Sequence, residues 1–476
     1  MLAVLCIYPH AGVDVCAQQS AFVAIDREAR SGAKGYDWLY WSTEHIGHRL
    51  TGTSHGTKAE RAADSLFRVG GIERVSFFPF TAQAWQRRTV DLTLSTGDSL
   101  WPVQAVALAH TPDSSRVTAT LLDAGNGLAE DFTRLGDRVR GAGVLMNLGL
   151  VDAPEGKHNL HRSEKTALAI AAGAASILFI NNVEGHVLLT GTASVDGYPI
   201  AIPVACISSE DGADLRSNLV GGGVVRADLS MTNSNGAVTA RNVIAEIRGT
   251  TKPDEVIVVG GHLDCWDLAS GATDNGLGSF SILDLARCFS ALALKPARTI
   301  RFVLFMGEEQ GLLGSSALVE TWRKSGELDK VKCMINLDMT GGPFGFNVVG
   351  PAGWGDVVKN IGKEIAALDT TFHNDLNEHA GLHSDHQPFM LRGVPVIAPL
   401  SDLGAHVYGC YHSSCDDINL VDPRRMVDNV RFTGMLLLGL SNAANLPDHF
   451  TDEALRDRLR AEGLEDKLRL QKDWRW

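Results

Sequence analysis

The chain has 476 residues, of which 45% are hydrophobic and 21% are charged, so it is long enough for two or three compact domains with substantial cores. Its formal net charge of -13 comes from acidic residues spread along the sequence, which argues against a phosphate-binding surface and against a nucleic-acid partner. No apolar run approaches the ~20 residues that cross a bilayer, so we expect no membrane span.

The start of the chain resembles the end of an export signal. A short apolar stretch precedes residues 15–19, Val-Cys-Ala-Gln-Gln, but a basic leading region is missing and Pro9 and Asp14 interrupt the stretch. We interpret residues 1–20 as a candidate remnant of an export signal, which favours a periplasmic or secreted protein.

The first half of the chain shows a helical sequence pattern followed by a β-rich one. Residues 36–69 read as largely helical, with a second helix at 58–69. Short β-rich runs with glycine-rich turns come next, interrupted by one helix over about 163–172 that leads into a strand at 176–180. Residues 232–236, Thr-Asn-Ser-Asn-Gly, favour turns and predict the linker that leaves this β-rich region.

The second half alternates between strand, loop and helix. A helix with apolar residues at Ile282, Leu285 and Phe289 follows the first of four buried apolar strands, which we expect at 255–260, 300–306, 334–339 and 394–400. This alternation predicts an α/β fold with a mostly parallel mixed sheet between layers of helices.

The sequence therefore divides into three units and a start segment. We expect a core unit made of residues 21–112 and 236–447, a β-rich insertion over 113–235, and a tail over 448–476 that reads as one amphipathic helix.

Polar side chains with metal-binding chemistry cluster at the ends of the predicted strands. Because the carboxyl ends of parallel strands meet at one edge of a sheet, we expect these side chains to lie close together. They are His262, Asp264, Asp274, Glu308, Glu309, Asp338 and His412. Each one alone is more often a hydrogen-bonded or solvated group, and it is their joint placement that indicates a site.

Imidazole and carboxylate ligands, with one carboxylate spanning both metals, suit a zinc pair that holds a bridging water. We expect His262 and Asp338 to bind one Zn²⁺, Glu309 and His412 to bind the other, and Asp274 to bridge them. The sequence thus predicts two Zn²⁺ per chain.

Two further carboxylates flank these ligands. Glu308 directly precedes a ligand, so it is placed to take a proton from the bridging water as a general base. Asp264 stands two residues after His262 and is placed to accept its other ring N–H, which would fix the tautomer.

The eight cysteines lack the paired spacing of a zinc ribbon, and most resemble buried thiols. Cys410 and Cys415 bracket His412 in one short loop. A local disulfide there stays an open alternative if the compartment is oxidising.

Five sequence blocks carry a family resemblance. They are Gly-His-Leu-Asp-Cys-Trp-Asp at 261–267, Gly-Ala-Thr-Asp-Asn-Gly at 271–276, Gly-Glu-Glu-Gln-Gly at 307–311, Asn-Leu-Asp at 336–338 and Tyr-His-Ser-Ser-Cys-Asp at 411–416. In this order they resemble the di-zinc aminopeptidase family that includes carboxypeptidase Q, and the resemblance extends from about residue 36 to 444.

The resemblance implies a zinc-exopeptidase domain of the phosphorylase/hydrolase-like fold, interrupted by a protease-associated domain. It also implies a cis peptide between Asp274 and Asn275. Tyr411 resembles a tyrosine that stabilises the oxyanion in related enzymes, with a packed loop aromatic as the equal alternative.

We therefore predict a zinc-dependent exopeptidase that removes N-terminal residues from peptides or dipeptides through a metal-bridging water activated by Glu308. Whether two copies of the chain form a homodimer stays open. A dipeptidase or carboxypeptidase is the first alternative, although no Arg or Lys can be assigned to the substrate's terminal carboxylate from the sequence. A non-catalytic receptor-like binding protein would need ligand loss, whereas all five ligands are present, and a glutaminyl-cyclase-like transferase would use one zinc.

Overall fold

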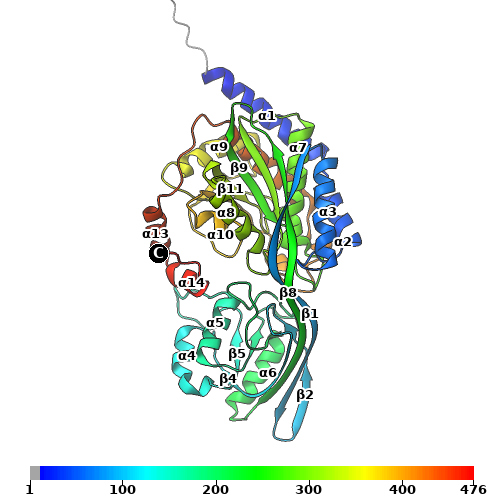
Figure 1. Ribbon diagram of the computed structural model, residues 1–476, viewed down its shortest axis with the longest axis vertical. Helices are drawn as coiled ribbons and strands as arrows, with labels where there is room; N and C mark the ends of the chain where they lie inside the picture. The colour runs from blue at the N-terminus through cyan, green and yellow to red at the C-terminus, as the bar shows by residue number, and fades with distance from the viewer. Residues whose placement is uncertain (1–10) are drawn as a thin grey trace, which may run out of the picture.

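The computed structural model describes residues 11–476 as a large and a small lobe that a long two-stranded ribbon joins (Figure 1). The ribbon pairs β1 (Arg74–Thr96) with β8 (Arg226–Ile247) in antiparallel register, from Arg74 opposite Glu246 to Ser95 opposite Arg226. Both strands run from one lobe into the other, so a single sheet continues through the described part of the molecule.

The large lobe contains the parallel core of this sheet. Strands β11, β9 and β10 are parallel neighbours, β14 joins them in parallel, and β8 and β12 flank them in antiparallel orientation. The strands are β9 (Lys252–His262), β10 (Arg298–Phe305), β11 (Val331–Asn336), β12 (Gly345–Val349), β13 (Asp375–Asn377) and β14 (Val396–Leu400). The prediction of a mostly parallel mixed sheet is confirmed.

Helices cover both faces of this part of the sheet. Because successive strand residues point to opposite faces, Ile257 and Val259 of β9 pack into one apolar core, and Val256 and Val258 pack into another. The first core is covered by α1 (Ala11–Ser31), α2 (Gly35–His45), α3 (Ser54–Val69), α7 (Leu277–Ala291), α9 (Trp354–Leu368) and α12 (Pro423–Asn442). The second is covered by α8 (Leu313–Ser325), α10 (His386–Met390), α13 (Asp452–Ala461) and α14 (Glu465–Leu470).

The small lobe has its own parallel strands and its own cores. Strands β4, β5, β6 and β7 are parallel neighbours, and β3 closes the path in antiparallel orientation. The elements are β2 (Ser99–Val103), β3 (Val106–Ala107), β4 (Ser114–Asp123), α4 (Ala129–Leu135), β5 (Gly143–Asn147), α5 (Arg162–Ala172), β6 (Ser176–Ile180), β7 (Val204–Ile207) and α6 (Ser209–Val220). A short helix of the large lobe, α11 (Ala405–Tyr408), precedes the loop that carries His412.

The predicted linker at residues 232–236 is wrong, because this segment lies inside β8. Its Asn, Ser and Gly residues pair with β1, where Asn235 stands opposite Trp85. Cross-strand pairing along the ribbon outweighs the local preference of these residues for turns.

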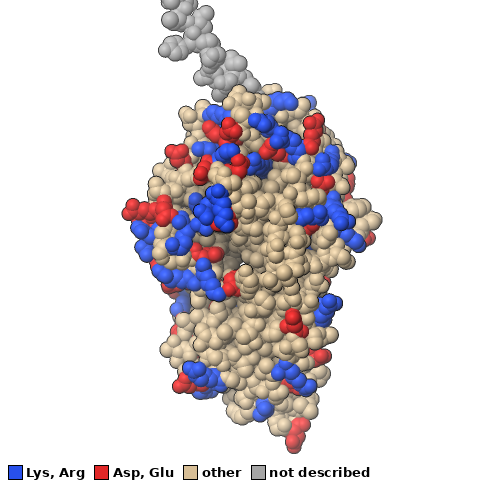
Figure 2. All heavy atoms as spheres, viewed as in Figure 1, with Lys and Arg blue, Asp and Glu red and all other residues tan. Residues whose placement is uncertain are grey.

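The tail is not the single helix that its pattern predicts, because it forms α13 and α14 with a break between them. Gly463, at φ 69°, ends α13 in the left-handed conformation that glycine adopts most easily. The two helices nevertheless bury their apolar side, since Leu455, Leu459 and Leu468 pack into the second core. Figure 2 shows Lys and Arg side chains gathered over α13 and α14, at the left of the view.

The predicted signal remnant at residues 1–20 is described only in part. Residues 1–10 lie outside the described residues, and residues 11–20 form the first half of α1. Among the described residues, helices that combine the length and the apolar character needed to span a membrane are absent.

Candidate metal centre

A cavity of about 390 Å³ lies where the carboxyl ends of the parallel strands in the large lobe meet the small lobe. All five predicted ligands line it, together with Glu308 and Tyr411, whereas the predicted Asp264 is fully buried behind His262. The small lobe also contributes to the wall. The lining residues from it are His161, Arg162 and Thr192.

The predicted ligands form two sets that share Asp274. Nε2 of His262 lies 3.2 Å from one Asp274 oxygen and 3.2 Å from Asp338 Oδ1. Nε2 of His412 lies 3.1 Å from the other Asp274 oxygen and 3.0 Å from Glu309 Oε2. The Asp274 carboxylate therefore stands between the two imidazoles, with one oxygen toward each.

These side chains fit divalent metal ions. Ligand atoms of His262, Asp274 and Glu309 lie within 4.8 Å of one another. Burial raises the pKa of Glu308 and of Glu309 well above the usual value, and neighbouring carboxylates raise both further. Glu309 Oε1 also lacks a hydrogen-bond partner among the described residues. Buried negative charge without compensation is unfavourable, and nitrogen and oxygen donors of this kind suit zinc.

Asp264 lies beneath the ligands, and its main chain is closer to the histidine than its side chain. The backbone carbonyl of Asp264 is 3.0 Å from Nδ1 of His262, and the carboxylate is 3.9 Å away. The carboxylate accepts a hydrogen bond from the Thr51 hydroxyl at 3.0 Å and one from the backbone N–H of Glu308 at 3.3 Å. It thus links the loop after β9 to the loop that carries Glu308.

The position of Asp274 is fixed by contacts of its own loop. The Asp274–Asn275 peptide is cis, as the family resemblance implies. The Asp416 carboxylate accepts hydrogen bonds from the Thr273 backbone at 2.8 Å, the Thr273 hydroxyl at 2.6 Å and the Asp274 backbone at 3.0 Å. Arg49 is fully buried and donates to three carbonyls of the preceding loop.

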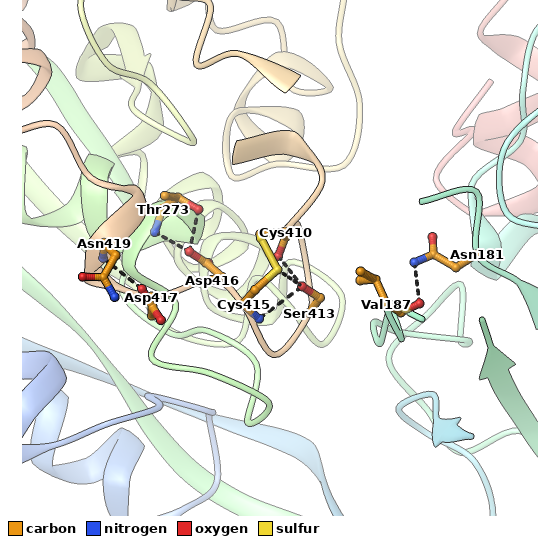
Figure 3. The surroundings of a disulfide bond; sticks show 9 residues. All are labelled: Asn181, Val187, Thr273, Cys410, Ser413, Cys415, Asp416, Asp417 and Asn419. Atoms are coloured by element: carbon orange, nitrogen blue, oxygen red, sulfur yellow. Dashed lines mark hydrogen bonds between the residues drawn. A yellow bond between two sulfur atoms is a disulfide. The ribbon is translucent and has the colours of Figure 1, made fainter. Parts of the chain in front are cut away.

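The loop that carries His412 is closed by a disulfide between Cys410 and Cys415, the alternative that the sequence left open (Figure 3). The Tyr411 ring stacks on the His412 ring, with centroids 3.7 Å apart. Burial raises the pKa of the Tyr411 hydroxyl, and the nearby charge of Arg162 offsets part of that rise.

Several residues of the site were missed from the sequence. Ser384 donates to Asp338 at 2.5 Å, and Asp385 is buried nearby with a pKa that burial raises to about 7. Both lie in the segment Ser-Asp-His-Gln-Pro-Phe at 384–389, outside the five blocks but within the range to which the family resemblance extends, and this segment was the available signal. His161 and Arg162 belong to the other lobe and carry no local motif, so only the folded chain brings them to the metal ligands.

Comparison with known protein families and curated proteins shows which proteins this chain resembles. Residues 242–435 match peptidase family M28, and residues 113–215 match the PA domain. Carboxypeptidase Q of Bos taurus is 26% identical over 402 residues, which cover 83% of this chain and 82% of that protein. A probable leucine aminopeptidase 2 of Aspergillus oryzae is 28% identical over 399 residues, which cover 78% of this chain and 76% of that protein.

Solved structures share the fold. The Peptidase M28 precursor from Shewanella amazonensis SB2B has a TM-score of 0.78 at 24% identity, covering 92% of this chain and 99% of that chain. A zinc aminopeptidase from Bacillus subtilis has a TM-score of 0.65 at 24% identity, covering 88% of this chain and 97% of that chain. The family resemblance of the five sequence blocks is thereby confirmed: residues 242–435 carry the match to peptidase family M28, and the match to the PA domain at residues 113–215 precedes it.

Proposed function

We propose that the chain is a zinc-dependent exopeptidase that hydrolyses the peptide bond next to the free end of a peptide or dipeptide. The observation that carries this proposal is the Asp274 carboxylate between the imidazoles of His262 and His412. Similarity to carboxypeptidase Q, to a leucine aminopeptidase and to zinc aminopeptidases supports it.

His262 and Asp338 would hold one zinc ion, Glu309 and His412 a second, and Asp274 both. When bound, the ions supply Lewis acidity that polarises the scissile carbonyl and acidifies an attacking water. The spacing of about 3 Å between the donor atoms of neighbouring ligands supports this assignment.

Glu308 acts as the general base in this proposal. Its side chain lines the cavity, and its backbone N–H is held by the Asp264 carboxylate. Burial raises its pKa, which brings the carboxylate closer to the protonation range of neutral pH. Glu308 takes a proton from the attacking water and later gives it to the leaving amine.

Tyr411 donates a hydrogen bond to the oxyanion that develops on the scissile carbonyl. Because its pKa is raised, the hydroxyl keeps its proton at neutral pH and is available as a donor. The stack on His412 and the disulfide-closed loop hold the ring against the ligand.

Asp264 is a positioning residue in this proposal. Its carboxylate connects Thr51 and the backbone of Glu308 to the loop of His262. Removal of this carboxylate would therefore change the position of Glu308 by releasing the loop that carries it. The disulfide in the His412 loop supports an oxidising location, periplasmic or secreted, for the folded chain.

The test is hydrolysis of a panel that contains dipeptides and aminoacyl amides, each with a free and with an N-acetylated amino terminus. Cleavage that needs the free amino terminus supports an aminopeptidase or dipeptidase. Cleavage of N-acetylated dipeptides at equal rates would turn the assignment toward a carboxypeptidase. Absence of turnover with zinc present would favour the receptor-like binding protein.

A further inference from the structure

An irregularity in β1 directs one arginine toward the loops of the metal centre. The pairing register of β1 with β8 shifts between Arg87 and Thr89, so that Arg88 is an extra residue in β1. Ala82 packs into the first core of the large lobe and Leu92 into a core of the small lobe, so the bulge lies where β1 passes from one lobe to the other. A β-bulge bends its strand and re-aims the side chains beside it. The side chain of Arg87 is only 12% exposed.

The guanidinium of Arg87 binds groups of both lobes. Nε and Nη2 donate to the two oxygens of the Asp267 carboxylate, at 3.2 and 2.9 Å. Nη2 also donates to the Thr190 hydroxyl at 2.8 Å, and Nη1 donates to the carbonyl of Ala107. Asp267 stands in the loop after β9 of the large lobe, whereas Thr190 and Ala107 belong to the small lobe. One side chain therefore joins a loop of the metal centre to the other lobe.

The contacts of Arg87 continue along two branches that both reach His412. The backbone N–H of Thr190 donates to the carbonyl of His412 at 2.9 Å. Trp266, which directly precedes Asp267, packs with its ring at an angle of 64° to the His412 ring, with centroids 5.9 Å apart. Arg87 thus holds a partner of the His412 main chain through Thr190 and a partner of the His412 ring through Asp267.

The ring of His412 depends on such contacts more than the ring of His262 does. Nδ1 of His262 lies 3.0 Å from the carbonyl of Asp264. Nδ1 of His412, by contrast, makes no hydrogen bond of ordinary geometry within the part of the chain that the structure describes. A metal-binding histidine usually donates its other ring N–H to a partner that fixes the ring. Main-chain contacts and the packing of Tyr411 and Trp266 therefore have to orient the ring of His412.

We propose that Arg87 is a positioning residue for His412 and thereby sets the zinc affinity of the site that His412 and Glu309 form. This inference rests on the proposed zinc-dependent function and adds to it a residue outside the ligand set. The site of His262 and Asp338 receives neither branch of contacts, because other groups hold these two side chains. Occupancy of one zinc site therefore depends on the junction between the lobes, and occupancy of the other does not.

The test is a calorimetric titration of the chelator-treated chain with zinc. We expect the wild-type chain to bind two equivalents. Arg87→Ala should weaken the binding of one equivalent about 10- to 100-fold, the range for partners outside the ligand set, and leave the other within a few-fold. A His412→Ala chain, which keeps only the site of His262 and Asp338, identifies the weakened equivalent. Addition of Arg87→Ala to that chain should leave its remaining zinc affinity unchanged.

Arg88→Ala is the matched control, because Arg88 is the exposed neighbour of Arg87 in the same strand. It should keep both wild-type zinc affinities. Arg87→Lys keeps the charge but lacks the planar fork that serves Asp267 and Thr190 together, so it should show an intermediate loss. Arg87→Ala leaves the Asp267 carboxylate unpaired. Should that chain not fold, Arg87→Ala combined with Asp267→Asn removes both charges and should weaken the same equivalent.

Unchanged zinc affinities in Arg87→Ala would overturn the inference, and so would an equal weakening of both equivalents. An effect of Arg87→Ala in the His412→Ala chain as large as in the wild type would overturn it as well. These outcomes leave the exopeptidase proposal standing. Binding of fewer than two zinc ions by the wild-type chain would instead remove the proposed metal centre itself.

Discussion

One oxygen of the Asp274 carboxylate lies 3.2 Å from Nε2 of His262, and the other oxygen is directed away from that ring toward the second imidazole of the site. A carboxylate in this position can serve two metal ions at once. Metal ions held there would also offset the cost of crowding several carboxylates into one buried cavity.

We predict that Asp274→Asn loses at least one zinc ion per chain and lowers kcat by about 100-fold or more, because even partners outside the ligand set contribute about 10- to 100-fold. The measurement is metal content by mass spectrometry together with peptide hydrolysis. Asp137→Asn is the control, since that side chain is 97% exposed. Full zinc content in Asp274→Asn would contradict the bridging assignment.

Glu308→Gln should keep its zinc and lose about 100- to 10,000-fold in kcat, the range that a positioned general base contributes. The amide has nearly the same shape but cannot take a proton. Steady-state kinetics and metal content on the same preparation test this. Glu453→Gln, at a side chain 81% exposed, should behave like the wild type. Near-normal kcat in Glu308→Gln would assign the base elsewhere.

The tail connects the two lobes through the side chain of Gln471, which is buried, with the residue 6% exposed. Its side chain donates to Glu164 at 2.8 Å and accepts from Gln387 at 3.0 Å. Gln471→Ala leaves buried polar groups unpaired, so we predict a loss of about 1–3 kcal/mol in unfolding free energy and a rise in KM larger than the change in kcat.

Denaturant unfolding and dipeptide kinetics measure both effects of Gln471→Ala. Gln104→Ala, at an exposed glutamine of the small lobe, is the control. Unchanged stability together with unchanged KM would mean that the tail does not support the cavity.

His110 makes stability depend on pH. It is fully buried, and burial lowers its pKa from 6.5 to about 4. The unfolded chain therefore binds more protons than the folded chain between these two values, so stability is complete above pH 6.5 and falls as the pH drops toward 4. For this one buried histidine, the loss amounts to about 3 kcal/mol at most.

Urea unfolding of the wild type and of His110→Gln at several pH values isolates this contribution. The variant should lose less stability than the wild type on acidification. His158→Gln, at an exposed histidine, should follow the wild-type profile. Parallel profiles for wild type and His110→Gln would show that the imidazole does not titrate as described.

That the predicted ligands come together in the fold could be foreseen, because their positions follow from sheet topology. His262 ends β9, and Glu309 and Asp338 follow β10 and β11, the two parallel neighbours of β9, so the order of strands and loops alone brings the three side chains to one edge. Arg162 was not predictable, because a separate domain delivers it across the junction between the lobes. A lone arginine at a helix start carries no signal of what it will face.

Two structural predictions failed where tertiary contacts outweigh local preference. Asn235 and its neighbours favour turns, yet they extend β8 because β1 supplies a pairing partner along the whole ribbon. The tail pattern is helical throughout, but Gly463 adopts a left-handed conformation and allows α14 to reach Glu164 through Gln471. Helical periodicity does not reveal such a break.

The most direct test of the central claim is a zinc titration of the chelator-treated wild-type chain, with hydrolysis of a free dipeptide followed at each step. We predict that activity rises with added zinc and reaches its maximum at about two equivalents per chain. Full activity of the metal-free chain, or no activity at any zinc concentration, would contradict a zinc-dependent exopeptidase built on Asp274.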